Sequence, residues 1–549
     1  MKRTYLSIVA PLFAAGIVLA AVVVLAHGCA SIDTPIGGRT DYDPPVALYY
    51  SPANYSTNFN AQKIVVTFDE RIKYKNLHKE LVVSPPIKDI IQRIRPTAVL
   101  PSKKMEIDLS GIELLPNTTY TLNFGAAVGD NHEGAAIPNF KYVFSTGPEI
   151  DSLTVGGVVR EALTGKFDPK TVVMLYRVDS TFTDSTIFKE RPMYFTRLAN
   201  EKDSTFLIEN IAPGTYQLVA LIDEGSDMMY HQSKDRIAFF PRHIHLEKPD
   251  STGYLLRLAQ ARRSYKAYQG INKQKGLIQI AIDGLEPQDG VRRIYPPLPE
   301  GANDYYLFNP DRDTLQYWFT GGEQDSILFV VEHNGRVADT INAKIRKPAQ
   351  EDFSVRIATR QLDLDGYIDI VTNKPVAEMN PKAILLLDKD STARPFSLKL
   401  DSTSLCRIEM TFPVAPENDY RLSILPDAIR SILGETAQDT ASIRLKTRSR
   451  DDYGNLTVDP VSLSQNRPLI VQLLSGENVV KETTLTQPEE KAVFRLVPPG
   501  QYRLRAIHDI NGNGRWDTVD YLKKQQPERV FYLDDRISIR AMWDEELVW

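Results

Sequence analysis

Short runs of alternating apolar and polar residues recur along the chain and constrain its fold more than any other feature. Examples are residues 64–68, 105–109 and 120–124. Successive side chains of a β-strand point to opposite faces of a sheet, so such runs predict strands with one buried face. Clusters of Pro, Asn and Gly separate the runs at short intervals. We therefore predict an all-β protein built from antiparallel β-sandwiches.

The size and charge of the chain limit its organisation and its partners. A chain of 549 residues is too long to share one hydrophobic core, so several domains are expected. Its 65 Lys and Arg and 70 Asp and Glu leave a formal net charge of −5. So small a net charge does not attract polyanions, and nucleic acid is not an expected partner.

The N-terminal residues have the pattern of an export signal. Lys2 and Arg3 precede an almost wholly apolar stretch, residues 6–26, and a short segment then leads to Cys29. This pattern resembles the signal peptide of bacterial lipoproteins, which is cleaved before a cysteine that becomes diacylated. The resemblance implies that residues 1–28 are removed and that Cys29 anchors the mature protein in a membrane.

An uncleaved transmembrane anchor is the alternative, because about 20 apolar residues suffice to span a bilayer. Leu25 also stands four positions before Cys29, where the lipoprotein family has a leucine three before. Both possibilities place the body of the protein outside the cytoplasm. Residues 29–43 are rich in Ser, Thr, Pro, Gly and Asp, which predicts a tether between the membrane and the first domain.

Residues 44–147 carry a recognisable set of motifs. They are Thr67-Phe68-Asp69-Glu70, the turn Pro116-Asn117-Thr118-Thr119-Tyr120, the loop from Asp130 to Gly134, and Phe144-Ser145-Thr146. This set resembles the bacterial Ig-like domain of surface-layer proteins and of Bacteroidota lipoproteins. Residues 351–448 contain similar motifs and are predicted to form a second such domain. Residues 253–350 are predicted to form a third, although 254–268 fit either a strand or a short helix.

A second type of domain is indicated by Ala212-Pro213-Gly214-Thr215-Tyr216 and the apolar run that follows. This motif resembles the transthyretin-like sandwich, and it predicts such a domain over residues 148–252. Pro499 and Tyr502 repeat the spacing of Pro213 and Tyr216. The repeat predicts another transthyretin-like domain over residues 449–549, and thus a duplicated pair of Ig-like and transthyretin-like modules.

Residues 509–520 have the spacing of a calcium-binding loop. Positions 1, 3, 5, 9 and 12 would be the side chains of Asp509, Asn511, Asn513, Asp517 and Asp520, and position 7 the carbonyl of Arg515. Calcium prefers six to eight oxygen ligands, and an Asp in place of the usual Glu at position 12 predicts weak binding, at about 10⁻⁴ to 10⁻³ M. The alternative is a tight loop whose side chains bond the local backbone.

Other residue types suggest simpler roles. Cys406 is predicted to be a buried apolar residue on a strand, and His243 and His245 two surface histidines. The sequence contains no serine-nucleophile elbow, zinc-protease, phosphate-loop or dinucleotide-binding motif. Exposed aromatic residues could bind glycans or proteins, and the candidates are Tyr49, Tyr50, Tyr305, Tyr306 and Trp318.

These observations predict a non-enzymatic, lipid-anchored protein of the outer membrane or cell surface. Sandwiches in series provide length and many loops, so the expected role is a spacer and protein-interaction scaffold, as an accessory of an outer-membrane assembly or secretion complex. A glycan-binding accessory of a polysaccharide uptake system is the alternative. A hydrolase would require a deep pocket with converging carboxylates or a histidine dyad.

Overall fold

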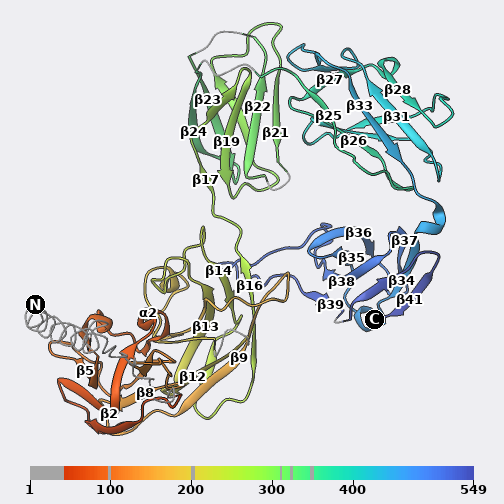
Figure 1. Ribbon diagram of the computed structural model, residues 1–549. Helices are drawn as coiled ribbons and strands as arrows, with labels where there is room; N and C mark the ends of the chain where they lie inside the picture. The colour runs from red at the N-terminus through yellow and green to blue at the C-terminus, as the bar shows by residue number, and fades with distance from the viewer. Residues whose placement is uncertain are drawn as a thin grey trace, which may run out of the picture. The chain divides into compact units, whose positions relative to one another are not determined.

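The computed structural model describes residues 42–96, 101–198, 204–309, 312–321, 325–346, 351–533 and 535–549. Strands dominate these residues, and the one α-helix described is the short α2 (Leu77–Glu80) (Figure 1). The prediction of tandem β-sandwiches is therefore confirmed. The predicted signal peptide and Cys29 lie outside the described residues. No helix in the described part of the chain is long and apolar enough to cross a membrane.

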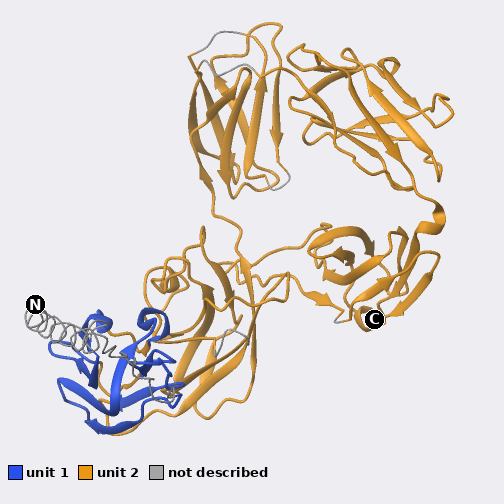
Figure 2. Ribbon diagram, in the orientation of Figure 1, with its two compact units in different colours: residues 1–81, 88–114, 122–144 blue, residues 82–87, 115–121, 145–549 orange. Residues whose placement is uncertain are grey.

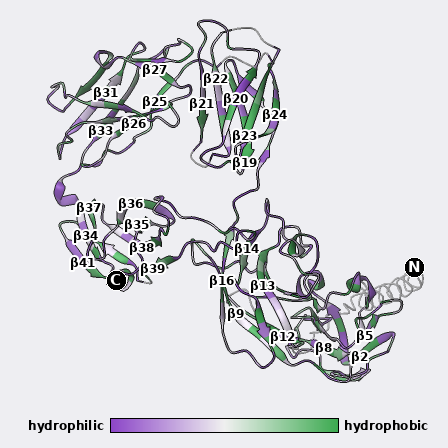
Figure 3. Ribbon diagram, turned by 180° about the vertical axis from the view of Figure 1, so that it is seen from behind, coloured by the Kyte–Doolittle hydropathy of each residue, from purple (hydrophilic) through white to green (hydrophobic). Residues whose placement is uncertain are grey.

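The chain divides into two compact units (Figure 2). The first comprises the described residues within 1–81, 88–114 and 122–144, and the second those within 82–87, 115–121 and 145–549. Hydrophobic and hydrophilic residues are mixed along the strands (Figure 3), and buried positions alternate with less buried ones in strands such as residues 63–68 and 454–459. The separate cores of the sandwiches form from the apolar faces of these strands.

The N-terminal sheets show how the sequence pattern becomes a core. Ile64, Val66 and Phe68 alternate on β2 and are almost fully buried. One sheet has the order β1-β2-β5-β4, with β7 also paired to β2, and another has the order β3-β6-β8. The bounds are β1 (Ala47–Ser51), β2 (Lys63–Tyr74), β3 (Val82–Ser84), η1 (Ile90–Arg93), β4 (Ile94–Arg95), β5 (Ser102–Asp108), β6 (Thr119–Asn123), β7 (Val128–Asp130) and β8 (Lys141–Ser145).

The region predicted to be the first transthyretin-like domain, which we call the first transthyretin-like region, forms one sheet of order β11-β10-β13-β14-β16-β9-β12, with β15 paired to β13. Its last strand, β16, runs parallel to β9. The predicted boundary at residues 252 and 253 therefore falls before the final strand of this sheet, and the uncertain segment 254–268 contains strands. The bounds are β9 (Leu153–Glu161), β10 (Thr171–Arg177), η2 (Thr186–Phe188), β11 (Tyr194–Arg197), β12 (Thr205–Ile211), β13 (Gly214–Ile222), β14 (Arg236–Phe239), β15 (Ile244–Leu246) and β16 (Tyr254–Gln260).

The C-terminal region repeats this succession of eight strands. Its sheets have the orders β36-β35-β38-β39, with β40 paired to β38, and β37-β34-β41, where β41 again runs parallel to the first strand. The bounds are η4 (Arg450–Asp452), β34 (Gly454–Asp459), η5 (Val461–Leu463), β35 (Leu469–Ser475), β36 (Asn478–Leu485), β37 (Ala492–Val497), β38 (Gly500–His508), β39 (Val530–Tyr532), β40 (Ile537–Ile539) and β41 (Asp544–Val548).

The repeated Pro-Gly motif makes the same contact in both copies. The hydroxyl of Tyr216 donates to the carbonyl of Ala212 over 2.8 Å, and that of Tyr502 donates to the carbonyl of Pro498 over 2.7 Å. Each tyrosine ring is buried beneath the turn that precedes it. The shared bond is a structural counterpart of the sequence repeat.

The intervening residues form two further groups of sheets. The first group has the orders β17-β19-β22-β21, with β18 paired to β19, and β20-β23-β24. Its bounds are β17 (Lys266–Ala267), β18 (Ile271–Gln274), β19 (Leu277–Asp283), β20 (Gly290–Tyr295), β21 (Asp304–Phe308), β22 (Thr314–Phe319), β23 (Ser326–His333) and β24 (Arg336–Lys344).

The second group has the orders β25-β26-β30-β29, β27-β32 and β28-β31-β33. It repeats an N-terminal contact, because Tyr420 accepts the N–H of Ala415 as Tyr120 accepts that of Leu115, each over 2.8 Å. The bounds are β25 (Val355–Ile357), β26 (Ile368–Thr372), β27 (Val376–Met379), η3 (Pro381–Ala383), β28 (Ile384–Leu387), β29 (Ser397–Leu400), β30 (Arg407–Thr411), β31 (Asp419–Ile424), β32 (Ile429–Ser431) and β33 (Ala441–Lys446).

Candidate functional site

The Asp- and Asn-rich loop leaves β38 and begins with a buried carboxylate. The side chain of Asp509 accepts hydrogen bonds from the backbone N–H of Asn513 over 3.0 Å and from that of Gly514 over 2.8 Å. Gly514 has a φ of 76°, a left-handed conformation that glycine adopts without strain. The first half of the loop therefore curves around the Asp509 carboxylate, which accepts its backbone N–H groups.

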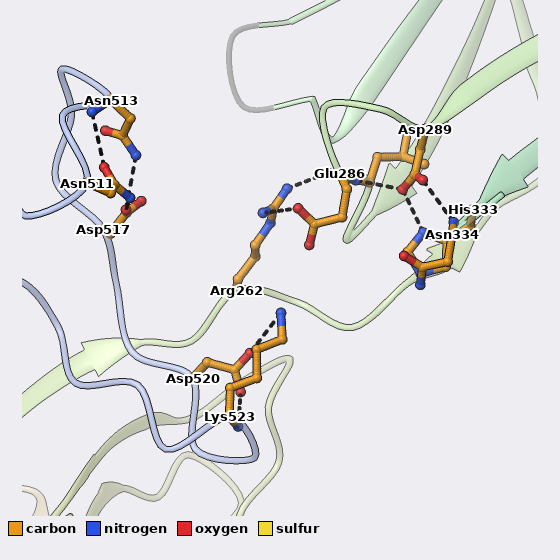
Figure 4. A network of polar contacts seen from close by, with 11 residues as sticks. Arg262, Glu286, Asp289, His333, Asn334, Asn511, Asn513, Asp517, Asp520 and Lys523 are labelled. Carbon is orange, nitrogen blue, oxygen red and sulfur yellow. Dashed lines mark hydrogen bonds and ion pairs between the residues drawn. The ribbon is translucent and has the colours of Figure 1, made fainter.

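The second half of the loop brings Asp517 back beside the side chains of the first half. One carboxylate oxygen of Asp517 accepts from the side-chain amide of Asn511 over 2.5 Å and from that of Asn513 over 3.0 Å (Figure 4). The backbone N–H of Arg515 donates to the side-chain oxygen of Asn513 over 2.9 Å. Asp517 therefore draws in the side chains of Asn511 and Asn513, while the Asp509 carboxylate binds the backbone of the same loop.

Asp520, the fifth predicted side-chain ligand, does not join this group. Its carboxylate accepts from the backbone N–H of Lys523 over 3.1 Å and lies 3.6 Å from the Lys523 ammonium. Figure 4 shows it apart from Asn511, Asn513 and Asp517. The reason is local, because Asp520 and Gln525 pair as a short β-bridge that turns the chain away from the loop.

The amide nitrogens of Asn511 and Asn513 face Asp517, so calcium binding would require both amides to turn their oxygens inward, and both interpretations of the loop stay open. Every hydrogen bond named so far is local, as the tight-loop alternative requires. The described residues contain no group of three or more His, Cys, Asp or Glu side chains placed to hold a metal ion. Calcium binding therefore stays a prediction, with a ligand set that lacks Asp520.

Glu528 closes the loop, and the sequence motif did not include it. Its side chain accepts from the backbone N–H of Ile510 over 2.7 Å and from that of Asp517 over 3.0 Å, which joins the two ends of the loop. Burial raises the pKa of this carboxyl. Glu528 lies beyond the twelve-residue spacing, so the calcium template could not identify it.

The first copy of the repeat has an equivalent carboxylate, and we call these two loop-closing residues, Glu528 and Asp235, braces. Asp235 is fully buried and accepts from the backbone N–H of Glu224 over 3.1 Å and from that of His231 over 2.7 Å. Burial also raises the pKa of Asp235. Asp223 and Asp509 are the last residues that the two motifs share, and Glu224 and Ile510 directly follow them. A comparison of the two copies could therefore have identified both carboxylates.

Two Asp–His pairs occur in the described part of the chain and bear on the enzymatic alternative. His231 lies 2.8 Å from Asp227, and this hydrogen bond raises the pKa of His231. His333 lies 2.6 Å from Asp289, while its other ring nitrogen lies 3.0 Å from the Asn334 amide. Both ring nitrogens of His333 are therefore engaged, and Asp289 also accepts the backbone N–H of Asn334 over 3.0 Å (Figure 4).

An open hollow of about 320 Å³ lies beside β26 and β30. Arg407 crosses it, donating to Asp369 over 2.8 Å and to the hydroxyl of Tyr367 over 3.0 Å. Asp363 accepts from the hydroxyl of Tyr453 over 3.0 Å. These polar groups are satisfied by one another, so their arrangement stabilises the fold and identifies no ligand.

The remaining sequence candidates occupy different environments. Trp318 is 1% exposed and belongs to a core, which removes it as a binding residue, whereas Tyr49 is 63% exposed. Tyr50, Tyr305 and Tyr306 are partly buried. His243 and His245 are both exposed, at the start of β15.

Cys406 corrects a prediction made from the sequence. It lies in the turn before β30, not on a strand, and it is only partly buried. Leu405, just before it, has a φ of 52°, which breaks the extended conformation that the apolar pattern suggested. Burial still raises the pKa of the thiol to about 11, so the neutral form dominates at pH 7.

Comparison with known proteins identifies one domain family. Residues 41–146 match the family described as the bacterial Ig-like domain. No curated protein matches this sequence.

Solved structures resemble the chain only remotely. Escherichia coli alpha-2-macroglobulin, over domains MG0-NIE-MG1, is 14% identical with a TM-score of 0.18, covering 34% of this chain and 72% of that one. The S-layer protein rSbsC(31-844) is 10% identical with a TM-score of 0.17, covering 89% and 67%. The Escherichia coli adhesin FdeC is 9% identical with a TM-score of 0.14, covering 60% and 93%.

Proposed function

We propose, starting from the bacterial Ig-like domain at residues 41–146, that this protein is a lipid-anchored scaffold of the bacterial cell envelope. Lipidated Cys29 holds it in the outer membrane or at the cell surface. The sandwiches that follow act as a spacer, and their loops contact another envelope protein, such as a component of an assembly or secretion complex. The proposed role requires no catalytic step.

The order of features along the chain carries this proposal. A cationic and apolar segment ends at Cys29, a polar stretch follows, and the Ig-like domain begins directly after it. This is the order that an anchored and exported domain requires. The rest of the described chain continues as β-sandwiches, whose connecting loops provide contact surfaces on rigid supports.

Replacing Cys29 with serine should abolish lipid attachment, because serine lacks the thiol that is acylated. The variant should lose palmitate labelling and leave the membrane fraction. It should also no longer co-purify with the envelope protein that the wild-type chain retains after mild cross-linking of native membranes. Metabolic palmitate labelling, membrane fractionation and mass spectrometry of the purified complex measure these effects.

Cys406→Ser is the matched control, since it removes the other cysteine of the chain. It should keep label, location and partner. Unchanged labelling of the Cys29→Ser variant would refute the lipid anchor. Recovery of bound glycan in place of a stoichiometric protein partner would favour the alternative role in polysaccharide uptake.

A weak calcium site in the 509–517 loop is a second proposal, supported by the ligand spacing and by the contacts that hold Asn511 and Asn513 beside Asp517. At about 10 mM calcium, a dissociation constant near 1 mM would stabilise the C-terminal domain by about 1.4 kcal/mol. The expected result is a rise of a few degrees in its melting temperature, reversed by EDTA.

Two variants test which ligand set is correct. Asp517→Ala should lose the calcium response, whereas Asp520→Asn should keep it, because Asp520 contacts Lys523 instead of the loop. Titration calorimetry and thermal unfolding measure both effects. Absence of heat and of a melting shift in the wild-type chain at 10 mM calcium (about tenfold above the dissociation constant expected) would eliminate the site.

A further inference from the structure

The sheet of the first transthyretin-like region is buried on both faces. Residues Val172 to Tyr176 of β10 are all buried, although a sandwich strand normally alternates between core and solvent. One face, with Val173 and Leu175, belongs to the core of the sandwich. The opposite face, with Val172 and Met174, belongs to a second apolar cluster, and other segments of the chain must shield that cluster from solvent.

Part of that cover comes from the C-terminal transthyretin-like region. Val519 and Tyr521 are 0% and 2% exposed and belong to the second cluster. The Tyr521 ring meets the Phe239 ring edge-on, with centroids 5.1 Å apart, and the Phe188 ring at 6.3 Å. Phe239 ends β14 of the first region, so segments far apart in the sequence share one apolar core.

We refer to residues 518–526 as the strap. It lies between the Asp- and Asn-rich loop and the brace residue Glu528. In the first copy the corresponding connection from Asp223 to Asp235 is shorter than the one from Asp509 to Glu528. The strap is therefore an insertion in the second copy, and it packs against the first copy.

Polar contacts fix the strap at both ends. The hydroxyl of Thr518 donates to the carbonyl of Gln260 over 2.6 Å, and the side-chain amide of Gln526 donates to the carbonyl of Phe239 over 3.1 Å. The Lys524 ammonium lies 2.5 Å from Asp184. These bonds fix the direction in which the strap crosses the apolar face of the first region. Apolar packing alone would not fix that direction.

Lys524 also covers the buried ring. Its ammonium lies 4.0 Å from the centroid of the Tyr521 ring and 5.8 Å from that of Phe239, close enough for cation–π attraction. A separate ion pair, Lys166 with Glu477 at 2.8 Å, joins the same two regions away from the strap. Leu522, in contrast, is 56% exposed.

We propose that the strap is an intramolecular clasp that holds the C-terminal transthyretin-like region on the first one. The surface that the clasp covers belongs to the same chain. Its apolar face binds Val519 and Tyr521, and its carboxylate, Asp184, binds Lys524. The clasp makes two regions that are distant in sequence one cooperative unit. Residues 262–453 are then joined at both ends to a single body.

Zero-length cross-linking tests the contact directly in the full chain. A carbodiimide should activate Asp184 and form an amide with Lys524, releasing the urea of the reagent. Mass spectrometry should detect the joined peptides in a mixture of isotopically light and heavy chains. Light–light and heavy–heavy products are expected. Mixed products would show a contact between copies, and absence of the product while Lys63 joins Glu106, which it contacts at 3.0 Å, would also overturn the clasp.

Tyr521→Ala and Leu522→Ala form a matched pair within the strap. Loss of the buried ring should reduce the yield of the Lys524–Asp184 product and accelerate tryptic cleavage after Lys524, each by about tenfold or more. The exposed Leu522 should be replaceable with less than about a twofold change. Equal behaviour of the two variants would overturn the proposal.

A charge reversal provides a test that leaves the core intact. Lys524→Glu should repel Asp184 and accelerate tryptic cleavage after Lys523. The double variant Asp184→Lys with Lys524→Glu should restore the resistance of the wild-type strap. Failure of the second change to restore resistance would show that Lys524 does not act through Asp184.

Discussion

Replacing Gly157 with alanine should lower the free energy of unfolding of the first transthyretin-like region by about 3 kcal/mol. Gly157 lies on β9 between β12 and the parallel strand β16. A Cβ atom there would lie 2.0 Å from the carbonyl oxygen of Tyr254 and 2.7 Å from its nitrogen. Both obstacles are backbone atoms, so the methyl group fits only if β16 moves away from β9.

Gly156→Ala is the control, one residue earlier on the same strand. Its Cβ would meet a methyl group of Leu207 and the carbonyl of Phe206 at 3.4 Å, which is ordinary contact. We expect a change below about 0.5 kcal/mol. Hydrogen exchange of peptides from β9 and β13 measures local opening, which should be about 100-fold more frequent in Gly157→Ala. Equal exchange in the two variants would contradict the close approach of β16.

Gly454, at the start of β34 in the second copy, is also approached by backbone. A Cβ atom there would lie 2.4 Å from the carbonyl oxygen of Arg540, which directly follows β40. Gly157 thus admits the parallel strand itself, whereas Gly454 admits the connection that leads to it. The sequence repeat was visible at Pro213 and Pro499, but these glycines carry no local pattern that reveals such an approach.

How far the fold could be predicted depends on what each pattern encodes. Alternation on β2 or β19 identifies a strand and its buried face, and both were predicted. Alternation does not identify the neighbouring strand. The pairing of β16 with β9 was therefore missed, and the domain boundary was placed before it.

The candidate site was predictable to the extent that its geometry is local. The loop around Asp509 and Asp517 follows from its spacing, whereas the bridge between Asp520 and Gln525, which the calcium template does not encode, directs Asp520 away from it. The strap itself left one signal in the sequence. The unbroken apolar run of β10 indicates a strand buried on both faces, although it does not show which segment supplies the cover.

Replacing Lys374 with methionine should destabilise the region of β26 and β27 by about 3 kcal/mol. The side chain of Lys374 is 3% exposed. Its ammonium donates to both carboxylate oxygens of Glu435, over 2.8 and 2.7 Å, and to the carbonyl of Glu351 over 2.5 Å. Methionine keeps most of the packing but leaves Glu435 without its cation.

A double-mutant cycle separates the ion pair from packing. Glu435→Gln keeps a side chain of the same size but removes the charge that compensates the buried ammonium. If the two groups act as a pair, the double variant Lys374→Met with Glu435→Gln loses less stability than the two single losses combined, with a coupling of about 1 to 3 kcal/mol. Hydrogen exchange of peptides from β26 and β32 measures each corner of the cycle. Additive losses would show that Lys374 contributes through its bond to the Glu351 carbonyl, and that the contact with Glu435 adds no stability.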